Sequence, residues 1–157
     1  MAMPGILKTL PLFVLLLAAL GGCASTPQAS QQRDAEAKQF ITHPATAAIY
    51  IYRTDRHHVD EDDSVLYVDG RLIGATLPQT FFRIDVNPGM HLLNGMGPDQ
   101  GSLKMETRPG QLYFVELNVI GGNSHFTVVD PQLAQRTIKA CCSFMEKWTP
   151  GQRPLLR

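Results

Sequence analysis

The densest group of reactive side chains is the stretch DRHHVDEDDS, residues 55–64. Its imidazoles and carboxylates could bind a divalent metal, and the candidate ligands are His57, His58, Asp60 and Asp62. The spacing matches neither the paired histidines of a zinc helix nor the calcium loop of an EF-hand. His57 and His58 also point to opposite sides of an extended chain. A solvated hairpin loop is therefore the favoured interpretation, and a metal or small-ligand site is the alternative.

A second candidate is the adjacent pair Cys141 and Cys142. Neighbouring Cα atoms lie about 3.8 Å apart, which is below the roughly 4.4–6.8 Å usual for a disulfide. A bond between the two is therefore sterically awkward. Three interpretations stay open: buried apolar thiols, which the pattern favours, an intermolecular disulfide, and a strained vicinal bridge or reactive pair. No C-x-x-C redox motif is present.

The sequence offers little else for catalysis. It contains no G-x-S-x-G, H-E-x-x-H or G-x-x-x-x-G-K motif. His91 and His125 fall within predicted strands, where a structural role is the favoured interpretation. We therefore predict no catalytic residue, no cofactor and a protein that is not an enzyme. The 14 basic and 14 acidic residues cancel, so no positive field exists to attract nucleic acid.

Residues 1–22 have the pattern of an export signal. Lys8 precedes an apolar run over residues 10–20. That run is much shorter than the roughly 20 residues that a membrane-spanning helix needs. The pattern predicts a signal peptide rather than a membrane anchor.

The residues that follow, LGGC at positions 20–23, resemble the lipobox of bacterial lipoproteins. The resemblance implies that Cys23 becomes the acylated first residue of the mature chain and attaches it to a membrane. An incidental thiol behind an ordinary signal peptide is the alternative. Ala24 after the cysteine is similar to the pattern that is sorted to the outer membrane. We therefore expect a lipid-anchored outer-membrane protein that faces the periplasm.

The rest of the chain divides into a tether, a domain and a tail. Residues 23–44 are rich in Ser, Gln and Ala, which predicts a flexible tether with room for a short helix over 33–40. Residues 45–142 alternate apolar runs with turn residues, which predicts an all-β domain with one C-terminal helix, folded as an antiparallel β-sandwich of about seven strands. Residues 143–157 form the tail. The predicted strands cover residues 47–53, 65–69, 80–86, 90–95, 102–107, 112–119 and 125–130.

Local patterns add detail to this domain. Asp69-Gly70 between apolar runs predicts a tight hairpin, because a type I′ turn needs positive φ. Asp130-Pro131 predicts an N-cap and a first helical residue, with the helix running to about Phe144. In the strand 80–86, alternation places one set of side chains in the core and the other in water. The predicted buried stripe of the helix is Leu133, Thr137, Ile138, Cys141, Cys142 and Met145.

Four segments, AAIYIYR (47–53), VLYVDGRLIGAT (65–76), FFRIDVNPGMH (81–91) and RPGQLYFVEL (108–117), resemble a family of small bacterial secreted and lipoprotein domains of unassigned function. The middle segments also resemble the PEGA repeat of bacterial envelope proteins. Both resemblances imply a β-sandwich, and neither implies a catalytic residue.

Three functions follow from these observations. The leading hypothesis is a non-enzymatic lipid-anchored protein that contacts another envelope component through a sheet edge or the loops at one end of the sandwich. The second is binding of a metal or small ligand by the loop 55–64. The third is an enzyme of unrecognised type, whose catalytic groups converge only in space.

Overall fold

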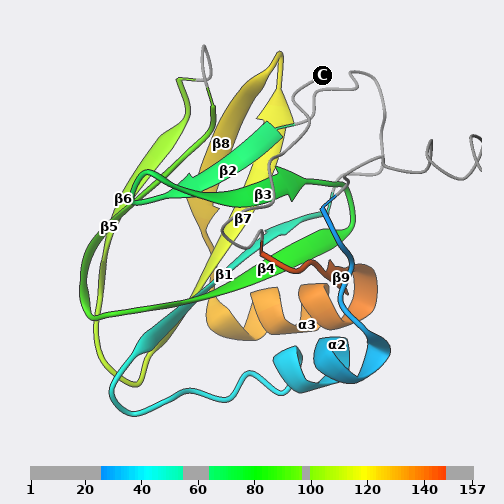
Figure 1. The fold of residues 1–157 in the computed structure, drawn as a ribbon, viewed down its shortest axis with the longest axis vertical. Coiled ribbons are helices and arrows are strands. Elements are labelled where there is room, and N and C mark those ends of the chain that lie inside the picture. The colour runs from blue at the N-terminus through cyan, green and yellow to red at the C-terminus, as the bar shows by residue number, and fades with distance from the viewer. Residues whose placement is uncertain (1–25, 55–63, 97–99, 148–157) are drawn as a thin grey trace, which may run out of the picture. The chain divides into compact units, whose positions relative to one another are not determined.

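The computed structural model describes residues 26–54, 64–96 and 100–147, which belong to one compact unit, Thr26–Gln152. Figure 1 shows their arrangement. The elements in chain order are α2 (Gln31–Ala37), β1 (Ala47–Arg53), β2 (Ser64–Val68), β3 (Arg71–Thr76), β4 (Thr80–Val86), β5 (Gly89–Asn94), β6 (Ser102–Thr107), β7 (Leu112–Ile120), β8 (Asn123–Val128), α3 (Pro131–Cys141) and β9 (Ser143–Phe144).

The strands form two sheets. One sheet has the order β8-β7-β1-β4-β9, and the other has the order β3-β2-β5-β6. Between them lies an apolar core that includes Ile51 and Phe82 from the first sheet and Leu66 and Leu93 from the second. The prediction of a mostly β domain with two packed sheets and a C-terminal helix is confirmed.

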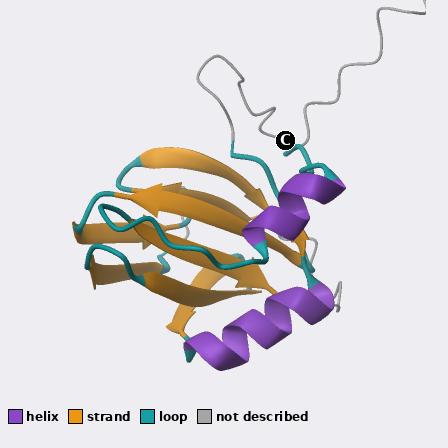
Figure 2. Cartoon of the chain, turned by 90° about the horizontal axis from the view of Figure 1, so that it is seen from below, coloured by secondary structure: helices purple, strands orange, loops and turns teal. Residues whose placement is uncertain are grey.

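The two helices cover the outer face of the five-stranded sheet, so the fold has three layers. A second apolar cluster joins Tyr50 and Phe114 of the sheet to Ala37 of α2 and Ile138 of α3. Figure 2 shows the helices in purple beside the strands in orange. Every residue of β1 is buried as a result. The prediction that one face of the strand 80–86 is in water is wrong at Phe81, which is buried because the helices replace water on that side of the sheet.

The strand predictions need two corrections. The described residues form nine strands rather than about seven, and the additional strands are β3 and β9. The sheets are not purely antiparallel either, because β1 pairs with β7 in parallel and β4 pairs with β9 in parallel. Both parallel partners are distant in sequence, whereas the antiparallel hairpins β2–β3, β5–β6 and β7–β8 join consecutive strands. Pairings of the first kind leave no local pattern.

Several local predictions are confirmed. Asp69 and Gly70 have φ values of 54° and 72°, as a type I′ hairpin requires. The side chain of Asp130 caps α3 by accepting hydrogen bonds from the amides of Gln132 and Leu133, with Pro131 in the first turn. In β4, Phe82 and Ile84 pack in the core between the sheets.

The tether predicted for residues 23–44 is wrong from Thr26 onward. Ser30 caps α2, and its side chain accepts a hydrogen bond from the amide of Arg33. Ala37 and Phe40 are buried against the five-stranded sheet. A segment that buries apolar side chains in this way belongs to the domain, so the domain begins well before residue 45.

The helix and tail predictions are also partly wrong. α3 ends at Cys141 rather than near Phe144, and residues 143–144 form β9 instead of a tail. Ala134 and Ile138 make the buried stripe of α3, whereas Leu133 is 51% exposed. Positions 134, 138 and 141 are spaced at the helical repeat and lie on the side of α3 that faces the sheet. Leu133 precedes Ala134 by one residue and therefore projects at a different angle around the helix axis.

Candidate functional site

The structure describes only some of the candidate residues that the sequence analysis identified. The anchor candidate Cys23 and the metal candidates His57, His58, Asp60 and Asp62 lie outside the described residues. Within residues 26–54, 64–96 and 100–147, no group of three or more His, Cys, Asp or Glu side chains could hold a metal ion. No helix of those residues is long and apolar enough to cross a membrane.

The first described residues form an N-terminal strap, Thr26–Ser30, that closes one side of the sandwich. The hydroxyl oxygen of Thr26 accepts a hydrogen bond of 2.9 Å from the amide of Ala75 at the edge of β3. Two further backbone hydrogen bonds join the strap to the other sheet: the amide of Ala29 donates to the carbonyl of Phe144, and the amide of Glu146 donates to the carbonyl of Pro27. The strap therefore connects the edge strands of both sheets.

A recess in β3 receives the strap. Thr26 is only 6% exposed. A Cβ atom on Gly74 would lie 3.1 Å from Cγ2 of Thr26 and 3.0 Å from the ring of Phe82. Because such contacts are too close, glycine at position 74 is what lets the strap approach the sheet. The strap also caps an exposed β edge, which otherwise invites pairing with another chain.

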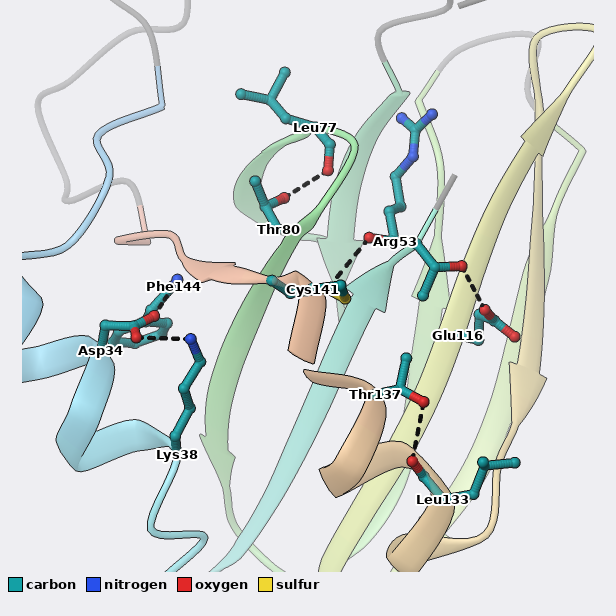
Figure 3. Close-up of a disulfide and its surroundings, with 12 residues drawn as sticks. Asp34, Lys38, Arg53, Leu77, Thr80, Glu116, Leu133, Thr137, Cys141 and Phe144 are labelled. Carbon is teal, nitrogen blue, oxygen red and sulfur yellow. Dashed lines mark hydrogen bonds and ion pairs between the residues drawn. A yellow bond between two sulfur atoms is a disulfide. The ribbon is translucent and has the colours of Figure 1, made fainter. Parts of the chain in front are cut away.

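Helix α2 holds the strap from its other end. The carboxylate of Asp34 accepts a hydrogen bond of 2.8 Å from the amide of Phe144 in β9 and lies 2.7 Å from the ammonium of Lys38. Figure 3 shows both contacts. Arg33 forms an ion pair with Glu146, which lies two residues after the end of β9. Strap, α2 and β9 are therefore one connected unit.

One buried tyrosine of β1, Tyr50, also holds α2. The hydroxyl of Tyr50 donates a hydrogen bond of 2.8 Å to the carbonyl of Ala37. Burial raises the pKa of Tyr50, against the opposing effect of the nearby Arg83 charge. Burial likewise raises the pKa of Tyr52 from 10.0 to about 12, and the negative charge of Glu116 adds to this effect. Both phenols are therefore neutral over the physiological range.

Cys141 and Cys142 form a disulfide with each other. The prediction that favoured buried apolar thiols is therefore wrong in this structure, although Cys142 does pack in the apolar cluster beneath the helices. Cys142 has already left the helix, with an extended backbone, which removes the helical geometry that opposed the bond. The sulfur of Cys142 lies 3.5 Å from the carbonyl oxygen of Arg53. The bond marks the junction between α3 and β9.

The opposite side of the sandwich carries an open hollow between the edge strands β6 and β8. Its volume is about 560 Å³, and a hydrogen bond of 3.0 Å from the amide of Gln100 to the side-chain oxygen of Asn123 spans the two hairpins. Uncharged amide and hydroxyl groups dominate its lining, together with one imidazole and one aromatic ring. The lining residues are Gln100, Gly101, Ser102, Asn123, Ser124, His125, Phe126 and Thr127.

The two strand histidines differ. His91 has the predicted structural role, because Nδ1 lies 2.7 Å from the Asp69 carboxylate and Nε2 lies 2.8 Å from the carbonyl of Asn87. Burial alone would raise the pKa of Asp69, but hydrogen bonds from His91 and from the amide of Leu92, with the charge of His91, lower it. His125 is exposed and lines the hollow, so the structural interpretation is wrong there.

Neither the N-terminal strap nor the hollow between β6 and β8 was predicted by the sequence analysis. The strap had a usable signal, because Ser30 followed by Asp34, Ala37 and Phe40 is a capped helix with an apolar face. The hollow had no linear signal, since its residues come from two hairpins that meet only in the fold.

Comparison with known proteins adds one relative. No family model matches the chain. A protein of Haemophilus influenzae described as an uncharacterized protein is 28% identical over 125 residues, which covers 76% of this chain and 74% of that protein. No solved structure matches. The resemblances to the secreted and lipoprotein domains and to the PEGA repeat stay predictions.

Proposed function

We propose that this protein is a non-enzymatic, lipid-anchored module of the bacterial envelope, attached to the outer membrane through Cys23 and exposed to the periplasm. The observation that supports this proposal is the position of the domain boundary. The compact unit begins at Thr26, three residues after Cys23. Removal of residues 1–22 as a signal peptide would therefore leave the described domain complete.

The anchor is tested by mass spectrometry and membrane fractionation of the wild type and the Cys23→Ser variant. We expect an acylated N-terminal cysteine and outer-membrane fractionation for the wild type alone, since several acyl chains together give stable attachment. If both forms are soluble and unacylated, the anchor proposal is wrong. Serine is nearly isosteric with cysteine, and position 23 precedes the domain, so folding is not at issue.

The module's binding surface is the hollow between β6 and β8. Its lining includes the hydroxyl side chains of Ser102 and Thr127, the imidazole of His125 and the ring of Phe126. Such a surface suits a neutral ligand rich in hydroxyl or amide groups. A charged ligand would find no permanently charged partner among these side chains.

A photo-crosslinking residue in place of Thr127 tests this surface in cells. Thr127 is exposed within the hollow, and Arg136, exposed on α3, gives the matched control position. We expect one discrete adduct from position 127 and none from position 136. Equal adducts at both positions, or none at position 127, would contradict this assignment.

The alternative is metal or small-ligand binding by residues 55–64, including His57, His58, Asp60 and Asp62. This proposal depends on the sequence alone. Calorimetric titration of the mature protein with Ca²⁺, Zn²⁺ and Cu²⁺ tests it, and no heat beyond dilution would exclude it.

A further inference from the structure

The short distance in sequence between Cys23 and Thr26 restricts where the domain can sit. Three residues of fully extended chain span at most about 11 Å. The polar headgroup layer on each side of a bilayer is itself about 5–8 Å thick. If Cys23 carries acyl chains at the membrane surface, Thr26 must lie in or just outside the headgroups. The restriction matters only if Thr26 cannot leave the domain.

The contacts of the strap show that it stays attached. Thr26 is buried, hydrogen-bonded to the edge of β3 and seated against Gly74. Gln28 then bridges to Met145, which is itself buried in the core between the sheets. Releasing the strap would expose both edge strands and break contacts to both sheets. The strap is therefore part of the domain and cannot serve as a spacer.

We infer that the strap side of the sandwich lies directly against the lipid headgroups. This inference rests on the proposed lipid anchor at Cys23. The surface consists of the strap, the turn over residues 77–79 and residues 146–147, which the hydrogen bond between Glu146 and Pro27 places beside the strap. Its partner is a lipid surface, and the domain has no free reach into the periplasm.

The charged side chains around α2 and β9 balance one another. This balance is consistent with a membrane contact that the lipid anchor imposes, and not with one that electrostatic attraction drives. A hollow of about 230 Å³, formed by α2, β4, β9 and residues 146–147, is lined by three cationic and three anionic side chains. The cations are Arg33, Arg83 and Lys147, and the anions are Glu36, Asp85 and Glu146. Because these charges balance, the protein without its lipid gains little attraction to anionic lipid.

The same geometry directs the other side away from the membrane. β8 lies four strand positions from β9 in the five-stranded sheet, a separation of about 19 Å at the usual strand spacing. The hollow between β6 and β8 therefore lies at the opposite edge of the five-stranded sheet from β9, which pairs with the strap. Membrane contact and ligand binding use opposite sides of one sandwich.

The test uses full-length acylated protein in vesicles of phosphatidylethanolamine and phosphatidylglycerol that contain a lipid with a nitroxide on its headgroup. Single cysteines are introduced by Lys147→Cys beside the strap and by Val128→Cys, at an exposed position on β8, and each carries a fluorophore. Cys141 and Cys142 are joined to each other and do not compete for the label. We expect the label at position 147 to be quenched at least about threefold more, because position 128 is on the side about 19 Å away.

A spacer variant provides the control. Twenty Gly and Ser residues inserted between Ser25 and Thr26 give a mean reach of roughly 25 Å. We expect this insertion to remove the difference between the two labels while acylation stays complete. Equal quenching at both positions in acylated protein without the spacer would overturn the inference and leave the anchor intact. Absence of acyl groups on Cys23 in the same sample would overturn the anchor proposal itself.

Discussion

Replacing Phe40 by alanine distinguishes a folded N-terminal segment from a tether. The Phe40 side chain is 9% exposed and packs edge-on against the rings of Tyr50 and Phe114, at centroid distances of 5.1 and 5.7 Å. Ile41 is the next residue and is 60% exposed. Ile41→Ala is therefore a matched control on the same segment.

The expected cost follows from this packing. Truncation of a core phenylalanine to alanine typically lowers the free energy of unfolding by about 3–5 kcal/mol. Phe40 lies at the rim of its cluster, where neighbours can partly close the gap, so we expect about 3 kcal/mol. Its φ of 54° adds nothing to the difference, because alanine meets the same backbone restriction. Ile41→Ala should change the free energy of unfolding by less than about 0.5 kcal/mol.

Urea unfolding of the mature chain, with Cys23→Ser in every sample for solubility, measures both changes. The two variants should share the wild-type slope and differ in midpoint. If Phe40→Ala and Ile41→Ala agree within about 0.5 kcal/mol, the packing of residues 26–40 on the sheet is refuted.

Three further experiments test the strap, the buried phenol of Tyr52 and the β2–β3 hairpin. Gly74→Ala should lower the free energy of unfolding by about 1–3 kcal/mol through overpacking, and adding Thr26→Ser should recover part of it by removing Cγ2; unchanged stability in urea would contradict the recess. Tyr52 has a folded pKa of about 12 against 10.0, so its contribution is present below pH 10 and is lost as pH rises to 12. Tyr52→Phe should reduce the alkaline loss of stability by about 2 kcal/mol, and identical pH profiles would count against this. The lowered pKa of Asp69 stabilises the fold above its ordinary value of 3.8, so the advantage over Asp69→Asn should disappear as pH falls below that value. Because the carboxylate is half exposed, the advantage is under about 1 kcal/mol, and an advantage that grows in acid would contradict a stabilising contact between Asp69 and His91.

Much of the sheet structure was predictable because its determinants are local. Alternation in β4 separated Phe82 and Ile84 from Arg83, since successive side chains in a strand point to opposite faces. Asp69-Gly70 marked its turn and Asp130-Pro131 marked its helix for equally local reasons. None of these features requires knowledge of a distant partner.

The features that the sequence analysis did not predict depend on segments that are distant in the chain. β3 contains Gly74, which weakens a strand pattern, yet that glycine is needed because Thr26 approaches from a remote part of the chain. β9 has two residues and exists because β4 and the strap lie on either side of it. A structural role was expected for His125 because it lies in a strand. In the fold, β6 and β8 are edge strands with a hollow between them, and His125 lines that hollow.

The amino-acid sequence by itself determined the short apolar segments, their turns, the cap of α3 and the candidate lipid site at Cys23, because each depends on a few neighbouring residues. Only the tertiary structure decided that residues 26–40 belong to the domain and that β1 is buried on both faces. It also decided that the strap and the hollow occupy opposite sides. These features depend on apolar burial and hydrogen bonding between segments far apart in the chain, and no local pattern encodes which distant surfaces will meet.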